Sequence, residues 1–181
     1  MTSRRDEVLV TALALLDDVG LDAITIRKLA ERLGVQPGAL YRHFTSKREL
    51  LDAMVDRLVS EAPAADLSGD WPDQVRAIAA AARSGMLAHR DGARLMSTFY
   101  TPGKDALVAW ERFVGLLLEA GLHLRDAHLA VDTIFSYVNG FTIEEQARGG
   151  MSREEKDRGF LAGIDLIVAG IKTRVTGPAE A

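Results

Sequence analysis

The sequence predicts an all-α protein, and three of its features lead to that fold class. Apolar residues recur at steps of three and four along nearly the whole chain, whereas the strict alternation of a β-strand is scarce. Breaks that contain glycine or proline divide this pattern into segments of helical length. The chain has 181 residues, of which 48% are hydrophobic, so it can bury a sizeable core in one or two domains.

A first helix is expected over residues 4–19, and Gly20 is expected to end it. The apolar residues of this segment fall on one face: Val8, Ala12, Leu15, Leu16 and Val19. So small an N-terminal unit needs a third helix to form a core. We therefore expect this face to pack on the two helices that follow.

Residues 24–47, with the sequence ITIRKLAERLGVQPGALYRHFTSK, predict two short helices joined by a tight turn. Thr25 suits the cap of the first helix, because its hydroxyl can accept a hydrogen bond from a first-turn amide. Gly34 follows the last apolar residue, where glycine adopts a left-handed conformation at little cost. Pro37 suits the first turn of the second helix, expected over residues 37–44. This is the helix-turn-helix pattern, whose second helix enters the major groove of DNA.

The same region is basic, although the chain as a whole is acidic. Residues 24–48 hold six basic side chains and one acidic side chain, a net charge of +5, whereas the whole chain carries −4. A local basic patch is typical of a surface that binds phosphates. The alternative is a solvated pair of amphipathic helices, but here the caps, the turn and the one-sided charge coincide. We therefore predict that this region binds DNA.

A linking helix is expected over residues 46–61, where Ser46 and Glu49 have the spacing of a capping box. Its inward residues are expected to be Leu50, Leu51, Met54 and Leu58. The segment APAADLSGDWP, residues 62–72, interrupts the helical pattern and marks a domain boundary. Further helices are expected over residues 71–88, shortly after Asp91, and over residues 104–120, 124–148 and 153–175.

Several stretches of the chain resemble the tetracycline repressor (TetR) family. ITIRKLAERLGVQPGALYRHFTSKRELLDAM is similar to the DNA-binding domain of the family, and ALALLDDVGLDAITIRKLA includes a segment similar to its first helix and loop. HRDGARLM and NGFTIEEQA resemble the family's regulatory core. The resemblance implies a helix-turn-helix DNA-binding domain at 1–48, a linking helix at 49–62, and a helical regulatory, ligand-binding and dimerisation domain at 63–181.

The resemblance also implies a function, that of a repressor that binds a palindromic operator as a homodimer and is released by a small molecule. The part of the chain beyond residue 48 is acidic and apolar, which suits a ligand sensor and a dimer interface better than DNA. The expected partners are therefore a double-stranded DNA operator, a small-molecule effector and a second copy of the chain. Two alternatives stay open: an activator, or a regulator without a small-molecule ligand that a protein partner controls.

The residues expected to contact DNA lie in and around the second short helix. Arg42 suits guanine, because its planar guanidinium can bond O6 and N7 together. Gln36 can read adenine or donate to a phosphate, Arg27 can reach either a base or a phosphate, and Ala39 can meet a thymine methyl group. Burial of the Tyr41 ring is an equal alternative to a DNA contact. The full expected set is Thr25, Arg27, Gln36, Gly38, Ala39, Tyr41, Arg42, His43 and Lys47.

The recognition segment differs from that of the family's tetracycline-binding members. Those members have a glutamine–proline–threonine entry and a tryptophan, where this chain has Pro37, Gly38, Ala39 and Arg42. Their operator sequence therefore does not carry over to this chain. Thr25 and Lys47 are expected to contact the phosphate backbone, which fixes position but carries no sequence information.

The drug site of the tetracycline-binding members is not retained in this sequence. There the drug arrives with a magnesium ion bound through a histidine and, by way of water, a glutamate. Met96 stands at the histidine position and Glu144 at the glutamate position. Magnesium prefers hard oxygen ligands, and a thioether does not bind it. The asparagine and phenylalanine that grip the drug align near Ile78 and Ala82, so we expect neither a metal, a cofactor nor a tetracycline–magnesium complex.

An apolar, aromatic pocket is expected in its place, suited to a small hydrophobic or aromatic molecule. The residues expected to line it are Met86, Met96, Phe99, Tyr100, Trp110, Phe113, Phe135 and Tyr137, with Asn139 as a polar contact. The alternative for each of these side chains is that it fills the core. The sequence does not identify the effector, the operator or the regulated genes.

The last two helices are expected to form the dimer interface as half of a four-helix bundle. Small or apolar residues lie on one face of the last helix at Gly159, Gly163, Leu166 and Gly170. Further apolar area is expected from Phe160, Ile164, Ile167 and Ile171. The alternative is that these residues pack only within one subunit.

Other classes of protein fit the sequence poorly. The tripeptide HRD at residues 89–91 begins a kinase catalytic loop, but no glycine-rich loop or DFG motif accompanies it. We expect His89 and Asp91 to cap and tether the neighbouring helices instead. No Ser/His/Asp arrangement is evident, so we expect no catalysis. The chain has no cysteine, which excludes disulfides. It shows neither a secretory signal nor a stretch long enough to span a bilayer, so we expect a cytoplasmic protein without a membrane partner.

Overall fold

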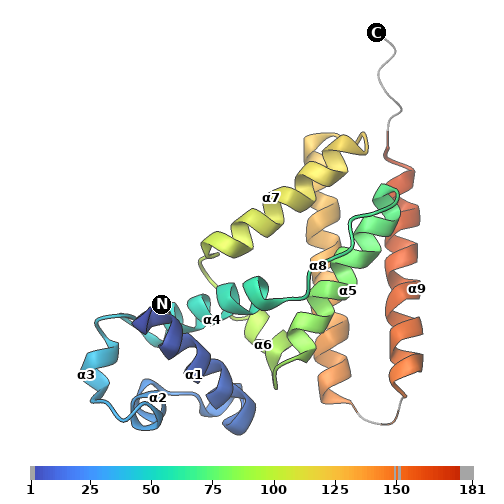
Figure 1. Ribbon diagram of the computed structural model, residues 1–181. Coiled ribbons are helices and arrows are strands. Elements are labelled where there is room, and N and C mark those ends of the chain that lie inside the picture. Colours follow the sequence, from blue (N-terminus) through green and yellow to red (C-terminus); the bar gives the residue numbers. More distant parts are fainter. Residues whose placement is uncertain (1–2, 149, 151, 176–181) are drawn as a thin grey trace.

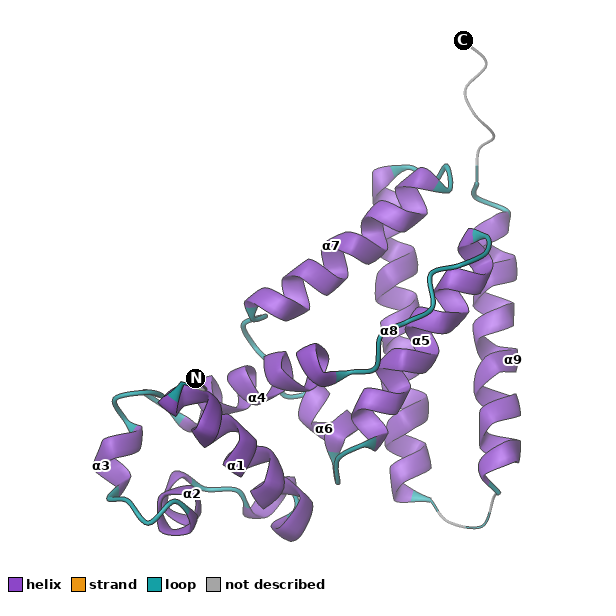
Figure 2. Ribbon diagram, in the orientation of Figure 1, coloured by secondary structure: helices purple, strands orange, loops and turns teal. Residues whose placement is uncertain are grey.

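The computed structural model describes residues 3–148, 150 and 152–175 of the chain. All regular secondary structure in these residues is helical, which confirms the predicted all-α class (Figures 1 and 2). The helices are α1 (Arg4–Val19), the 3₁₀ turn η1 (Leu21–Ala23), α2 (Ile26–Arg32), α3 (Pro37–Leu40), α4 (Lys47–Glu61), α5 (Trp71–Leu87), α6 (Gly92–Met96), α7 (Lys104–Glu119), α8 (Leu124–Ala147) and α9 (Arg153–Lys172).

The helices form an N-terminal group and a larger C-terminal group, with α4 leading from one to the other (Figure 1). Helices α1, α2 and α3 gather at one end of the molecule. In the C-terminal group α8 and α9 run side by side, and α5 packs against both. Helix α7 contacts α4 at one side and α8 at the other, so the regulatory half touches the linking helix directly.

The N-terminal helices share one apolar core. The inner face of α1 packs on α2, as expected, but its other main contact is α4 and not α3, the second helix of the predicted pair. The buried residues of this core include Val8, Ala12, Leu16, Leu29, Leu40, Phe44, Leu50 and Met54. Phe44 is buried completely, and the guanidinium of Arg5 lies 5.0 Å from the centre of its ring.

The predicted turn chemistry of the helix-turn-helix is confirmed. The Thr25 hydroxyl accepts a hydrogen bond from the amide of Lys28 at 3.1 Å, which caps α2. Gly34 has a φ of 65°, in the left-handed region that glycine adopts without strain. These two local signals position α2 against α3.

Two local expectations need correction. Ser46 does cap α4 by accepting from the amide of Glu49 at 3.1 Å, but Glu49 does not complete the capping box. Its carboxylate reaches Thr45 instead, where it accepts from the amide and from the hydroxyl at 2.7 Å each. Helix α3 is also shorter than expected, because it ends at Leu40 and turns carry the chain to Phe44. The amide of His43 donates to the carbonyl of Leu40, three residues earlier, which is the spacing of a 3₁₀ turn and not that of an α-helix.

The remaining helices lie within a few residues of the expected ranges, and α9 ends at Lys172 rather than at 175. Asp91, just before α6, has a φ of 56°, a left-handed conformation that aspartate tolerates better than most residues. None of the described helices is long and apolar enough to cross a membrane.

Candidate DNA-binding and ligand-binding sites

The residues predicted to contact DNA lie on the segment from the start of α2 to the start of α4, and most of them are at the surface. Tyr41 is 52% exposed, so its ring is available at the surface rather than buried. Ala39 and His43 are partly buried. The other members of the set are exposed: Thr25, Arg27, Gln36, Gly38, Arg42 and Lys47. The buried side chains of Leu40 and Phe44 hold this surface in place from below.

Several polar side chains on this surface have no partner within the described part of the chain. No other described residue forms a hydrogen bond or an ion pair with the side chains of Arg27, Gln36, Arg42 or Lys47. Arg32, by contrast, pairs with Asp18 of α1. A cluster of exposed, uncompensated cations on a rigid scaffold is suited to bind the phosphates and base edges of a duplex.

A network of ion pairs and hydrogen bonds ties α1 to the segment between α5 and α6. The carboxylate of Asp17 lies 3.1 Å from Nδ1 of His89 and accepts from the amide of Arg90 at 2.9 Å. The carboxylate of Asp91 accepts from the amide of Leu21 at 2.9 Å. The expected tether by His89 and Asp91 is therefore confirmed, but the expected cap is not, because the Asp91 side chain accepts no capping hydrogen bond at the start of α6. They join the DNA-binding helices to the regulatory half.

A second connection joins α4 to the segment between α6 and α7. Asp52 accepts from the amide of Tyr100 at 2.8 Å, and Asp56 accepts from the amide of Ala106 at 2.9 Å. A Cβ at Gly103 would lie 2.2 Å from Cγ of Asp56, so only glycine permits this close approach. The guanidinium of Arg48 lies 4.8 Å from the centre of the Tyr100 ring. The α6–α7 segment is thus held along α4.

The nine residues predicted to line a ligand pocket do not all meet in one place. Three of them form an aromatic cluster between α7 and α8. The Trp110 and Phe135 rings stack with centroids 6.1 Å apart, and Phe113 meets Phe135 edge-on at 5.7 Å. Asn139 lies one turn further along α8 and donates to the hydroxyl of Ser97 at 2.9 Å, beside Met96. Its Oδ1 is buried and accepts no hydrogen bond from the described residues.

The other predicted ligand residues lie apart from this cluster. Phe99 and Tyr100 are exposed in the α6–α7 segment, and Met86 is buried in α5. Tyr137 faces α9, where its hydroxyl donates to Phe160 O at 3.1 Å. Burial raises the pKa of this tyrosine. Two surface pockets, of about 650 and 540 Å³, are lined by none of the nine residues.

The described residues contain no group of three or more histidines and carboxylates placed to hold a metal ion. Met96 is partly buried against the core. The carboxylate of Glu144 lies 3.1 Å from the guanidinium of Arg148 and is largely exposed. Met96 therefore packs against the core, and Glu144 forms a surface ion pair.

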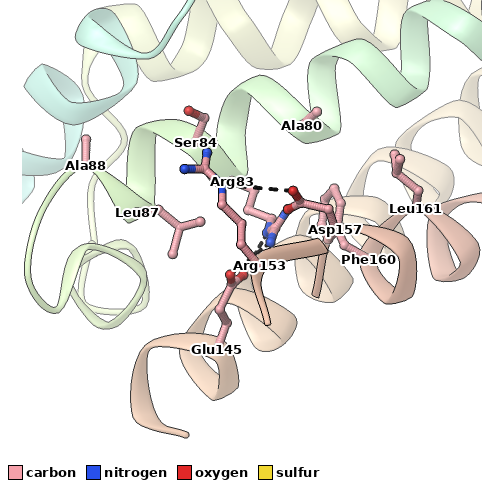
Figure 3. A pocket seen from close by; sticks show the side chains of 10 residues that line it. All are labelled: Ala80, Arg83, Ser84, Leu87, Ala88, Glu145, Arg153, Asp157, Phe160 and Leu161. Carbon is pink, nitrogen blue, oxygen red and sulfur yellow. Dashed lines mark hydrogen bonds and ion pairs between the residues drawn. The ribbon is translucent and has the colours of Figure 1, made fainter. Parts of the chain in front are cut away.

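A buried ion-pair network was missed by the sequence reasoning. Arg83 of α5 donates to both carboxylate oxygens of Glu145 at 2.7 and 2.9 Å, and to Asp157 at 2.7 Å (Figure 3). Its guanidinium also lies 4.8 Å from the centre of the Phe160 ring. Burial alone lowers the pKa of Arg83, but the bonds to Glu145 and Asp157 outweigh it and raise the pKa. The sequence feature that could have indicated this network is the position of Arg83 on the apolar face of α5.

Several residues expected at the dimer interface pack within the subunit. A Cβ at Gly163 would lie 2.0 Å from the Tyr137 hydroxyl, so this glycine admits the ring between α8 and α9. Phe160, Ile164 and Ile171 are buried in the same seam. On the outer face, in contrast, Leu166 is 77% exposed.

Comparison with known proteins places the chain in a family. Residues 8–54 match the bacterial regulatory proteins of the tetR family, and residues 62–154 match the tetracyclin repressor-like C-terminal domain. The chain is 42% identical over 145 residues to the class A tetracycline repressor of transposon 1721 from Escherichia coli. That match covers 77% of this chain and 66% of the repressor. The chain therefore spans about two thirds of this curated relative.

Solved structures agree over nearly the whole chain. A variant of TetR from Acinetobacter baumannii AYE, in complex with minocycline, is 32% identical with a TM-score of 0.84, covering 98% of this chain and 100% of that one. BioQ with its double-stranded DNA operator is 34% identical with a TM-score of 0.79, and the match covers 93% of this chain and 98% of BioQ. The family members found are regulators and not enzymes. The chain belongs to the TetR family of transcriptional regulators.

Proposed function

We propose that the protein is a repressor that binds a palindromic operator as a homodimer and releases it when a small apolar or aromatic molecule binds. Residues 1–48 would bind the DNA, and residues 63–181 would hold the ligand and the dimer interface. Residues 49–62 would form the helix that links these two domains. The observation that carries the proposal is the exposed surface around α3, where Arg27, Gln36, Arg42 and Lys47 have no partner among the described residues. A repressor of this kind would act in the bacterial cytoplasm, where the DNA is.

On the DNA, α3 would lie in the major groove. Gly38 and Ala39 have little or no side chain, which lets the backbone approach the base edges. Gln36 at the entry and Arg42 beyond the end of α3 would read bases. Thr25, Arg27, Tyr41, His43 and Lys47 would contact the phosphates or the groove edge.

The outer face of α8 and α9 would form the dimer. Leu166 and Leu129 are exposed apolar side chains on these two helices. A Cβ at Gly140 or at Gly170 would meet nothing within 4 Å, so both helices leave room for a close neighbour. Packing against a symmetry mate would bury this surface and hold two α3 helices about 34 Å apart, one turn of duplex DNA.

The effector would bind between α6, α7 and α8, at the Trp110–Phe135 cluster. The buried Oδ1 of Asn139 accepts no hydrogen bond from a described residue, and leaving it so costs about 1–3 kcal/mol. An effector with a hydroxyl or an N–H group would satisfy it. Met96, where tetracycline-binding relatives have a histidine, favours an effector that arrives without magnesium.

Release of the operator would follow from movement of the α6–α7 segment. Asp52 holds this segment, and Asp56 holds the first turn of α7, on α4, whose first residues are Lys47 and Arg48. An effector that displaced the segment would shift α4 and change the separation of the two α3 helices. Affinity for the operator would then fall, and operator would weaken effector binding by the same factor.

Fluorescence anisotropy with a labelled duplex tests the proposal. The operator comes from selection on random DNA, a scrambled duplex serves as the control, and a panel of aromatic hydroxy compounds serves as effectors. We expect two chains per operator, much weaker binding to the scrambled duplex, and release by at least one compound. A compound that binds at the Trp110–Phe135 cluster without any change in operator affinity would contradict the induction scheme.

A further inference from the structure

A second pocket, separate from the proposed effector site, lies between α5 and α9. This α5–α9 pocket has a volume of about 650 Å³, within the range of small-molecule sites. Its lining comes from the end of α5, the end of α8 and the start of α9 (Figure 3). The lining residues are Ala80, Arg83, Ser84, Leu87, Ala88, Glu145, Arg153, Asp157, Phe160 and Leu161. None of them belongs to the predicted DNA or effector sets.

The floor of the α5–α9 pocket is polar and fixed. The side chains of Arg83 and Glu145 are each 9% exposed and joined by two hydrogen bonds. Asp157 supplies a third bond to Arg83 at 2.7 Å. Both carboxylates of the pocket are therefore already bonded to the buried guanidinium, and neither is left wholly free to receive a cation.

Arg153 differs from Arg83, because it is a cation without a close partner. Its side chain is 94% exposed, and its nearest carboxylate oxygen, Oδ2 of Asp157, lies 4.0 Å away. In Figure 3 the side chain extends from α9 across the pocket toward Ser84 of α5. No described residue forms a hydrogen bond with the Ser84 hydroxyl. The Arg153 guanidinium and the Ser84 hydroxyl thus both line the opening of the pocket, and both can donate hydrogen bonds to a ligand there.

The walls beside this opening are apolar. Leu87 on α5 and Leu161 on α9 are both exposed and lie at opposite ends of the pocket, with Phe160 beside Leu161 and the arginine side chains between the two leucines (Figure 3). A hydrocarbon chain or ring laid between the two leucines would remove apolar surface of both from water. The pocket therefore combines apolar side chains with an exposed arginine at its mouth, Arg153, whose ion pair with Asp157 is long, at 4.0 Å.

We propose that the α5–α9 pocket binds a small molecule with an apolar body and a single carboxylate. Arg153 binds the carboxylate through paired N–H groups, and the Ser84 hydroxyl donates a further hydrogen bond. Leu87 and Leu161 cover the apolar body. The site uses the face of α8 that carries Glu145, whereas the proposed effector site uses the face that carries Phe135, so the two sites are independent.

Titration of the full-length protein with octanoate, 1-octanol and octylamine, followed by NMR of the methyl groups, tests this proposal without DNA. These probes share a chain length and differ in charge. Octanoate is expected to bind about tenfold more tightly than octanol, because it alone gains the charge-assisted hydrogen bonds. The methyl signals of Leu87 and Leu161 are expected to shift, whereas the Trp110 ring signals stay unchanged.

Two variants complete the experiment. Arg153→Gln is expected to lower octanoate affinity about tenfold and to leave octanol binding unchanged. Arg158→Gln, which removes an exposed arginine of the same helix outside the pocket, is expected to change neither. Equal binding of octanoate and octanol, tighter binding of octylamine, shifts at Trp110 instead of the leucines, or no binding of octanoate would each overturn the proposal. Operator binding is not measured, so these outcomes leave the proposed repressor function unaffected.

Discussion

Asp52 of α4 accepts a hydrogen bond from the backbone amide of Tyr100 at 2.8 Å. The two residues belong to the linking helix and to the α6–α7 segment, which lie far apart in the sequence. Helix α4 begins at Lys47, directly after the DNA-binding turn. This carboxylate, together with that of Asp56, thus joins the regulatory half to the helix that would set the position of α3.

Removal of this carboxylate should loosen the α6–α7 segment. Asp52→Ala is expected to lower the free energy of unfolding by about 1–3 kcal/mol, because the bond has a charged acceptor. It is also expected to speed hydrogen exchange of the Tyr100 amide, measured by NMR. Asp52→Asn, which keeps an acceptor oxygen, should stay closer to the wild type. Unchanged exchange at Tyr100 in Asp52→Ala would show that the bond does not hold the segment.

Arg42 and Lys47 should affect DNA binding in different ways. Arg42→Ala is expected to lose about 1–3 kcal/mol on the specific duplex and little on random DNA, because it would read a base. Lys47→Ala is expected to weaken binding to all duplexes alike and to reduce the salt slope by about one. Anisotropy titrations at several salt concentrations measure both. An equal loss on specific and random DNA for Arg42→Ala would remove this residue from a base-reading role.

The seam between α8 and α9 should not tolerate a side chain at Gly163. A Cβ there would lie 2.0 Å from the Tyr137 hydroxyl, so Gly163→Ala is expected to cost about 1–3 kcal/mol of unfolding free energy in urea. Gly115→Ala on α7 is the matched control. A Cβ at Gly115 would meet nothing within 4 Å, and replacing a helical glycine by alanine should stabilise the folded protein by up to about 1 kcal/mol. Similar effects of the two substitutions would contradict the packing described for Tyr137.

Glu49 should contribute to stability in a pH-dependent way. Its pKa lies below the usual value because the carboxylate accepts hydrogen bonds from the Thr45 hydroxyl and amide. A lowered pKa in the folded state means that the contribution is present above the unfolded value, about 4.3, and is lost as the pH falls through the folded value. Glu49→Gln is expected to reduce the loss of unfolding free energy at acidic pH, measured by urea unfolding at several pH values. A wild-type slope in the variant would be inconsistent with the Thr45 contact.

Local signals in the sequence predicted most of the helices. Thr25, Gly34 and Pro37 act on their immediate neighbours, so cap and turn chemistry alone located the helix-turn-helix. The same local reasoning overestimated α3 because it had no measure of how the buried Phe44 draws the chain inward. It also assigned Glu49 to Ser46, although the adjacent Thr45 offers two donors.

Contacts between distant segments could not be predicted in this way. Arg83 meets Glu145 and Asp157, which are 62 and 74 positions away in the chain. The predicted set of pocket residues includes both Phe135 and Tyr137, but residues two positions apart on a helix point to different sides. Phe135 therefore faces α7 and Tyr137 faces α9. Helical periodicity indicates which side chains are buried, and only the packing shows against which helix.

Selection of binding sites from random duplex DNA by the purified full-length protein, at physiological salt, tests the central claim most directly. The account predicts enrichment of a palindrome with two half-sites about 10 base pairs apart, bound by two chains. Replacing Arg42 by alanine should relax the preference at one position in each half-site. Recovery of no sequence above background by the ligand-free protein would contradict a sequence-specific dimeric repressor.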